Sequence, residues 1–221
     1  NDLGGTDQTF GFDTALRTAT EAIDKLHTTA EAHHRVMVVE VMGRHAGWIA
    51  LHAAIAGGAH VCLIPEIPFG WEAVARAVKV RSGMGKRFSI VVVAEGAFPA
   101  GGEPALVGKG RLGGMAHMAA DRLEDMTGLE TRATVLGHLQ RGGGPTAFDR
   151  VLATRYGVAA VDAIAAGKLG TMVALKGSAI VTVPLAEAVG TPKRVDPKDQ
   201  LVRAARDLGM AFGDETAASA S

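Results

Sequence analysis

The chain has 221 residues, of which 48% are hydrophobic and 21% are charged, a composition typical of one or two globular domains. Its 23 basic and 23 acidic side chains leave no formal net charge, so we expect no nucleic-acid or membrane partner, and an anion site must be a local cluster. One cysteine excludes a disulfide framework. Charges or glycines interrupt every apolar run before it reaches the ~18 residues of a membrane span. We therefore expect a cytoplasmic protein without a signal segment.

Helices and strands are predicted to alternate along most of the chain. Phe12 to about Glu31 repeats apolar residues at helical spacing, and the β-branched run Arg35–Val41 predicts a strand that is buried on both faces. Further helices are predicted at 46–56, 71–80, 115–126, 145–166 and 199–208, and further strands at 61–64, 88–94, 131–136, 171–175 and 179–183. A glycine-rich loop is predicted over 96–114, and a small-residue tail that frays is predicted at 217–221. The alternation favours an α/β fold with a mainly parallel sheet.

Polar side chains follow three of the predicted strands. Arg44 follows the first strand, Glu95 a later one, and His138 and Arg141 the strand at 131–136, each beside glycines. Ligands of open parallel sheets bind beyond the carboxyl ends of the strands, and the helix predicted from Ala46 points its positive end there. An arginine guanidinium forms bidentate hydrogen bonds with phosphate oxygens, and a carboxylate accepts hydrogen bonds from sugar hydroxyls. The pattern therefore indicates a site for a phosphorylated polyol.

Each of these residues also has a structural alternative. Arg44 fits a solvated turn, Glu95 a surface carboxylate, and His138 a histidine whose hydrogen bonds are satisfied within the fold. A second alternative concerns Gly108–Gly113, which satisfies the G-x-G-x-x-G pattern of a dinucleotide-binding oxidoreductase. The short preceding strand, beside Pro104, makes tight turns the favoured interpretation of these glycines.

The same strand ends resemble the 6-phosphofructokinase family. The resemblance rests on Arg35–Arg44 (RVMVVEVMGR), Val93–Gly96 (VAEG) and Thr131–Gly143 (TRATVLGHLQRGG), in the family's order and spacing. The opening Asn1–Asp7 is similar to the end of the family's Thr-Ile-Asp-Asn-Asp catalytic segment, and the likeness extends to about Leu175. It implies a doubly wound, two-lobed phosphofructokinase-like fold. The implied reaction is phosphoryl transfer from ATP or pyrophosphate to the 1-hydroxyl of fructose 6-phosphate in glycolysis.

The resemblance also implies the residues that bind the sugar phosphate. Met42, Gly43 and Arg44 match the segment that binds fructose 6-phosphate, with Arg44 near the transferring phosphoryl group. Glu95 matches the carboxylate that holds sugar hydroxyls. The segment that grips the 6-phosphate is matched by His138, Leu139, Gln140 and Arg141. A non-catalytic module that binds sugar phosphates through the same residues is the alternative function.

The remaining matches concern the metal and a neighbouring subunit. Asp2 matches a catalytic aspartate beside Mg²⁺ and the transferred phosphoryl group. Arg35 and Arg132 match arginines that reach the 6-phosphate bound in a neighbouring subunit, which implies a homo-oligomer, typically a tetramer.

Departures from the family pattern imply a domain organisation. The family's general base, two positions before Asp2, and its two glycine-rich donor segments have no counterpart here, so we expect a C-terminal portion without kinase activity of its own. Residues 1–11 would be a remnant of the donor lobe, 12–139 the sugar-phosphate lobe, 140–190 an incomplete return to the donor lobe, and 191–221 a C-terminal helix and tail. An exposed apolar face is expected on the return, formed by Val151, Leu152, Val158, Val161, Ile164 and Val173.

Overall fold

The computed structural model describes residues 1–108 and 110–215, which divide into two compact units. Unit 1 comprises Asn1–Ala15 and Arg141–Arg194, and unit 2 comprises Leu16–Gln140 with the chain from Val195 onward. The C-terminal helix therefore belongs to the same unit as the large central segment. The tail predicted at 217–221 lies outside the described residues.

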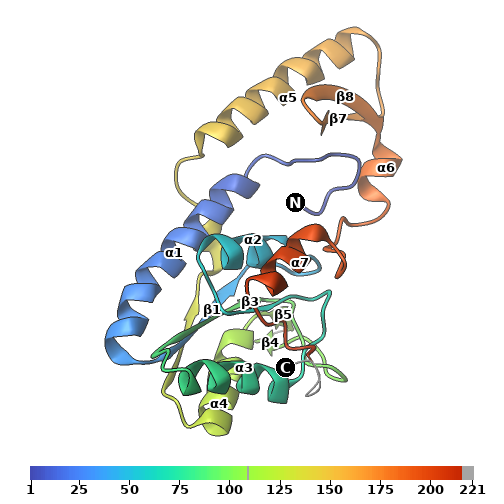
Figure 1. Cartoon of the computed structure of the whole chain (residues 1–221). Coiled ribbons are helices and arrows are strands. Elements are labelled where there is room, and N and C mark those ends of the chain that lie inside the picture. The colour runs from blue at the N-terminus through green and yellow to red at the C-terminus, as the bar shows by residue number, and fades with distance from the viewer. Residues whose placement is uncertain (109, 216–221) are drawn as a thin grey trace. The chain divides into compact units, whose positions relative to one another are not determined.

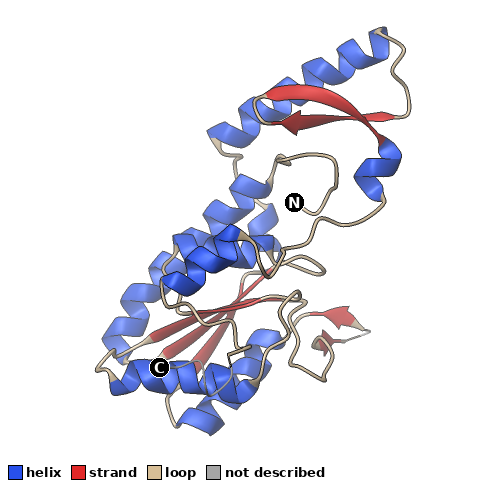
Figure 2. Ribbon diagram, turned by 45° about the vertical axis from the view of Figure 1, so that its right-hand side comes forward, coloured by secondary structure: helices blue, strands red, loops and turns tan. Residues whose placement is uncertain are grey.

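Unit 2 is built on a four-stranded parallel sheet in the order β2-β3-β1-β6 (Figures 1 and 2). Its strands are β1 (Val36–Val41), β2 (Val61–Leu63), β3 (Ser89–Ala94) and β6 (Thr131–Val135). Every residue of β1 and β3 is buried, as the mostly apolar runs predict for strands that are covered on both faces. The predicted parallel α/β sheet is confirmed.

Helices cover both faces of this sheet. The helices are α1 (Phe12–His33), α2 (Trp48–Ala56), α3 (Trp71–Gly83), α4 (Met115–Thr127) and α7 (Gln200–Asp207). In Figures 1 and 2, α3 and α4 lie on one face, while α2, α7 and the unit 2 part of α1 lie on the other. The chain steps outward from β1 to β2 through α2, then back through α3 and α4. Right-handed crossovers in opposite directions place their helices on opposite faces, so the sheet is doubly wound.

The glycine-rich stretch after β3 contains a small hairpin that the sequence did not predict. Strands β4 (Leu106–Val107) and β5 (Arg111–Leu112) pair antiparallel. They were not predicted because two-residue strands are too short to show a periodic pattern. The glycines of the G-x-G-x-x-G pattern at Gly108 and Gly110 lie in the hairpin turn, and Lys109 lies outside the described residues. A dinucleotide-binding loop joins a parallel strand directly to a helix. The oxidoreductase interpretation is therefore wrong.

Unit 1 combines one long helix with an antiparallel hairpin. Its elements are α5 (Ala147–Ala165), β7 (Thr171–Lys176), β8 (Ala179–Pro184) and the short helix α6 (Leu185–Val189), which was not predicted. Thr146 caps α5 by accepting a hydrogen bond from the Asp149 N–H at 3.2 Å, as its position predicts. Leu152, Tyr156 and Leu175 form a small core. Among the helices that the structure describes in the two units, none is long and apolar enough to cross a membrane.

The outward side of α5 is apolar and exposed. Four of the residues expected there are 60–66% exposed to solvent: Val151, Val158, Val161 and Ile164. The expectation is wrong for Leu152, which is only 3% exposed because it packs against Tyr156 and Leu175, and Val173 packs on the same small core. Within the described part of the chain, α5 thus carries an uncovered apolar face.

Candidate functional site

The carboxyl ends of three neighbouring strands bring five predicted site residues to one edge of the unit 2 sheet. β1 lies between β3 and β6, and adjacent strands lie about 4.8 Å apart. Met42, Gly43 and Arg44 follow β1, Glu95 follows β3, and His138 follows β6. We call these five residues the carboxyl-end cluster.

Two turns of the carboxyl-end cluster interlock through hydrogen bonds. The Gly43 N–H donates to Glu95 Oε1 at 3.4 Å, and the Gly96 N–H donates to the Gly43 carbonyl at 3.0 Å. Gly96 is buried, and a Cβ added to it would lie only 2.0 Å from the Arg44 carbonyl oxygen. Only glycine allows the two backbones to approach this closely. The half-buried Glu95 is thereby fixed beside the backbone that carries the exposed Arg44.

The amino end of α2 has a different role from the one expected. Glu66 accepts the Gly47 N–H at 3.0 and 3.1 Å and the Val195 N–H at 2.8 Å. This carboxylate occupies the positive end of α2, so the helix end is already neutralised by the protein itself. The prediction that α2 attracts a bound anion is corrected accordingly.

A buried carboxylate within β1 supports the same sheet edge. Glu40 is 3% exposed within β1 and accepts the Ala116 N–H at 2.8 Å and the Gly114 N–H at 3.3 Å, both at the start of α4. Burying a carboxylate is costly unless it is hydrogen-bonded, and the helix end supplies those bonds. Glu40 was not predicted as a site residue, although an acidic residue inside an otherwise apolar strand was the available signal.

The segment after β6 forms the 3-10 helix η1 (Gly137–Arg141). His138 and Leu139 are exposed, whereas the Gln140 side chain is buried. Arg141, the last residue of η1, falls in unit 1. Unit 2 therefore contains nine of the eleven predicted site residues, and unit 1 contains Arg141 and Asp2.

Asp2 presents one exposed carboxylate in unit 1. The N-terminal ammonium of Asn1 lies 4.0 Å from its Oδ1, and the Asp2 carbonyl accepts the Lys193 N–H at 2.8 Å. No group of three or more His, Cys, Asp or Glu residues that could hold a metal ion occurs in the described ranges 1–108 and 110–215. Mg²⁺ typically binds one or two protein carboxylates together with substrate phosphates. The single Asp2 carboxylate fits that mode.

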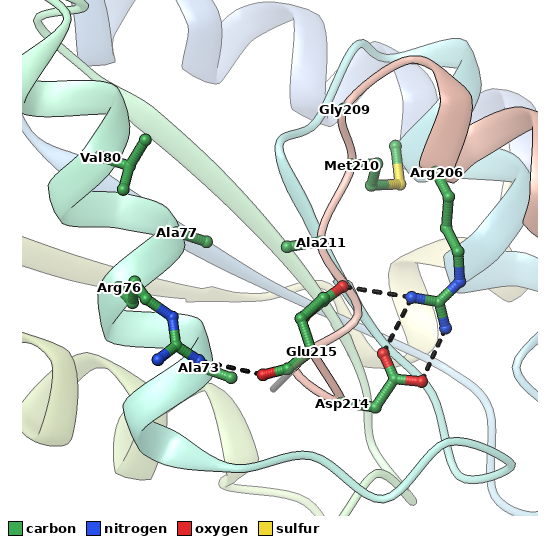
Figure 3. Close-up of a pocket in the computed structure, with 10 residues that line it drawn as sticks. All are labelled: Ala73, Arg76, Ala77, Val80, Arg206, Gly209, Met210, Ala211, Asp214 and Glu215. Atoms are coloured by element: carbon green, nitrogen blue, oxygen red, sulfur yellow. Dashed lines mark hydrogen bonds and ion pairs between the residues drawn. The ribbon is translucent and has the colours of Figure 1, made fainter. Parts of the chain in front are cut away.

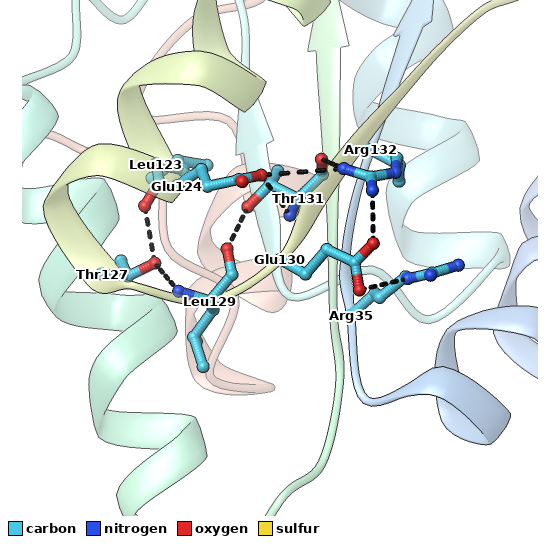
Figure 4. A network of polar contacts seen from close by, with 8 residues as sticks. All are labelled: Arg35, Leu123, Glu124, Thr127, Leu129, Glu130, Thr131 and Arg132. Carbon is cyan, nitrogen blue, oxygen red and sulfur yellow. Dashed lines mark hydrogen bonds and ion pairs between the residues drawn. The ribbon is translucent and has the colours of Figure 1, made fainter.

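Arg35 and Arg132 lie at the opposite, amino-terminal end of the same strands (Figure 4). Arg35 precedes β1, and Arg132 pairs with Met37 near the start of β1. Both arginines form ion pairs with Glu130, at 2.8 Å for Arg35 Nε, and Arg132 also lies 3.8 Å from Glu124. The Arg35 guanidinium, with Arg132 beside it, holds the pKa of Glu130 below its usual value. The structure therefore groups these arginines with each other and not with the carboxyl-end cluster.

A groove of about 550 Å³ lies elsewhere in unit 2, between α3 and the segment from Arg206 to Glu215 (Figure 3). The Arg206 guanidinium binds both oxygens of Asp214 at 2.9 and 2.7 Å, and the Glu215 carboxylate at 3.2 Å. The Arg76 guanidinium donates to the Glu215 carbonyl at 2.9 Å. The groove shares no residue with the carboxyl-end cluster, and Arg206 is already paired, so we assign no phosphate binding to it.

Comparisons with known proteins find similarity along most of the chain. The family model described as Phosphofructokinase matches residues 1–164. An ATP-dependent 6-phosphofructokinase of Chloroflexus aurantiacus is 63% identical over 215 residues, covering 97% of this chain and 60% of that protein. A pyrophosphate–fructose 6-phosphate 1-phosphotransferase of Amycolatopsis mediterranei is 60% identical over 203 residues, covering 88% of this chain and 59% of that protein.

Solved structures show the same relationship in three dimensions. A pyrophosphate-dependent phosphofructokinase from Marinobacter aquaeolei superposes with a TM-score of 0.80 at 26% identity, covering 96% of this chain and 54% of that one. Phosphofructokinase from Saccharomyces cerevisiae gives 0.74 at 39% identity, covering 86% of this chain and 25% of that one. The chain spans about 60% of the length of the curated relatives that it matches.

Proposed function

Because this chain belongs to the phosphofructokinase family, we propose that it supplies the sugar-phosphate side of an enzyme that phosphorylates fructose 6-phosphate at its 1-hydroxyl in glycolysis. The donor is ATP or pyrophosphate, since close relatives carry either name. The observation that carries the proposal is the meeting of Arg44, Glu95 and His138 at the ends of three adjacent strands. Phosphoryl transfer depends mainly on positioning and charge stabilisation, which such a cluster can provide.

Residues of the carboxyl-end cluster and of η1 have separate tasks in this proposal. The exposed Arg44 guanidinium binds fructose 6-phosphate close to the transferring phosphoryl group, whose charge it stabilises. Glu95, held through Oε1 by the Gly43 N–H, accepts hydrogen bonds from the sugar hydroxyls. His138 and Leu139 in η1 contact the 6-phosphate, and the family resemblance assigns Arg141 to the same phosphate.

Asp2 is proposed to contribute the protein's carboxylate to Mg²⁺. When bound, the ion neutralises charge on the donor phosphates. The Asp2 carboxylate, exposed to solvent, would hold the ion.

We also propose a homotetramer in the cytoplasm, in which Arg35 and Arg132 reach the phosphate of a neighbouring subunit. Their position at the amino end of the strands, away from the carboxyl-end cluster of their own chain, supports this arrangement. Their ion pairs with Glu130 keep both guanidiniums on one patch.

Isothermal titration calorimetry tests the proposed binding. Fructose 6-phosphate is titrated into the chain, its Arg44→Ala variant and an Arg122→Ala control, since Arg122 is an exposed arginine on α4. We expect Arg44→Ala to lose about 1.5–3 kcal/mol of binding free energy, the scale of a charge-assisted hydrogen bond, and the control to lose none. Equal binding by all three proteins contradicts the assignment of Arg44. Binding without turnover in the longest natural form of the protein would favour the non-catalytic alternative.

A further inference from the structure

Gln140 differs sharply from its neighbours in η1. Its side chain is 1% exposed, whereas Leu139 is 72% exposed and His138 faces solvent. A buried amide is costly unless both its oxygen and its nitrogen are hydrogen-bonded. The partners of Gln140 therefore indicate what this residue does.

Both ends of the Gln140 amide bind backbone within unit 2. Its Oε1 accepts the Met42 N–H at 3.3 Å, and its Nε2 donates to the Gly137 carbonyl at 3.2 Å. The first bond reaches the residue that follows β1, and the second lies within η1 itself. Gln140 thus connects the two segments that carry Arg44 and His138.

The Met42 bond takes the place of a missing bond in the β1–β6 ladder. Glu40 of β1 pairs with Val135 of β6, and the last backbone bond runs from the Leu136 N–H to the Glu40 carbonyl at 3.0 Å. In a parallel ladder the next bond would run from the Met42 N–H to the Leu136 carbonyl. That carbonyl instead accepts the Leu139 N–H at 3.1 Å, because the chain turns into η1.

The turn into η1 is sharp because Gly137 has a φ of 47°, in the left-handed region that favours glycine. Without a substitute acceptor, the Met42 N–H would lose its strand partner where β6 ends. The Gln140 side chain supplies that acceptor, while Glu95 holds the next N–H, that of Gly43, from the side of β3.

We infer that Gln140 is a positioning residue, not a ligand of the sugar phosphate: its buried amide closes the β1–β6 ladder and fixes the Met42-Gly43-Arg44 turn against η1. This inference rests on the proposed function for its effect on substrate. For Gln140 alone, this role replaces the direct contact with the 6-phosphate that the family resemblance implied. The fixed turn holds Arg44 at the end of β1 and His138 at the end of β6 before substrate binds. The entropy cost of ordering these segments on binding is therefore smaller.

The test compares Gln140→Met, Gln140→Glu and a Gln200→Met control on the full 221-residue chain; Gln200 is exposed in α7 of the same unit. Amide hydrogen exchange at Met42 is measured by NMR without ligand, and fructose 6-phosphate affinity by calorimetry. Methionine preserves the volume but cannot accept the Met42 bond, so exchange should become about five- to tenfold faster and affinity should fall by a similar factor. Glutamate keeps the acceptor oxygen, and burial favours its protonated form, whose O–H can donate to the Gly137 carbonyl, so its Met42 exchange should stay close to that of the original chain.

The outcomes separate positioning from direct contact. If Gln140→Met weakens binding while Met42 exchange is unchanged, Gln140 contacts the ligand and the inference is overturned. If neither quantity changes, the inference is overturned as well. If the unsubstituted chain does not bind fructose 6-phosphate, the proposed function fails, but the exchange rates of Met42 in the two Gln140 variants still decide whether this side chain fixes the turn. Should Gln140→Met unfold, Gln140→Glu must retain slow Met42 exchange for the inference to stand.

Discussion

His60 provides a prediction about stability and pH that the chain itself can test. Its Nδ1 accepts the Ile90 N–H at 2.9 Å, and its ring lies 5.7 Å from that of Phe88 and 6.4 Å from that of His27. Burial, with smaller effects from the nearby Arg81 and His27, lowers the pKa of His60 from 6.5 to about 4. A protonated Nδ1 could no longer accept the Ile90 bond.

The sign of the effect follows from the lowered pKa of the folded state. The unfolded chain binds a proton at His60 near pH 6.5, before the folded chain does, so folding is favoured fully above that pH. The stabilisation is lost as the pH falls from about 6.5 towards 4. Each unit of pKa difference corresponds to about 1.4 kcal/mol, so lowering the pH from about 8 to 5 should cost roughly 2 kcal/mol through this group.

His60→Asn is the matched variant, because the asparagine oxygen can accept the Ile90 N–H but does not titrate. Urea unfolding is followed at both pH values by tryptophan fluorescence, since the chain's two tryptophans, Trp48 and Trp71, both lie in unit 2. The original chain should lose roughly 2 kcal/mol more stability on acidification than the variant. Equal losses in the two proteins would refute the lowered pKa of His60.

Three further predictions concern the proposed activity. Glu95→Gln should reduce discrimination between fructose 6-phosphate and glucose 6-phosphate more than phosphate affinity, because a neutral amide accepts hydroxyl hydrogen bonds less strongly; calorimetry showing unchanged discrimination would contradict this. Arg141→Ala should cost about 1.5–3 kcal/mol of fructose 6-phosphate binding, and an unchanged Kd would remove Arg141 from the phosphate site. The 221-residue chain should form no fructose 1,6-bisphosphate from ATP or pyrophosphate in a coupled assay, because no residue of it matches the family's general base; turnover that follows the purified chain would overturn this expectation.

The fold of unit 2 could be predicted from the sequence because its two central strands, β1 and β3, are almost entirely apolar. The runs at Val36–Val41 and Ser89–Ala94 are apolar apart from Glu40 and Ser89, and a glycine and a charged residue follow each run within three positions. Burial on both faces requires such runs, and the alternation with helices then specifies a parallel sheet. The strand ends, and with them Arg44, Glu95 and His138, could therefore be predicted.

What sequence analysis missed depends on contacts between distant segments. Gln140 and Met42 are 98 residues apart, and nothing local shows that the Gln140 amide turns inward. Glu66 cancels the positive end of α2 from 19 residues away. The two-residue strands β4 and β5 and the five-residue α6 are too short for a periodic signal.

Chemical-shift mapping with fructose 6-phosphate tests the central claim most directly. The ligand is titrated into the ¹⁵N-labelled chain, and amide resonances are followed at the carboxyl ends of β1, β3 and β6. We predict saturable shifts that share one Kd at Gly43, Glu95 and His138, the three neighbouring strand ends. If these three amides do not respond, or if the only saturable shifts map to the groove between α3 and the segment from Arg206 to Glu215, the carboxyl-end cluster is not the sugar-phosphate site.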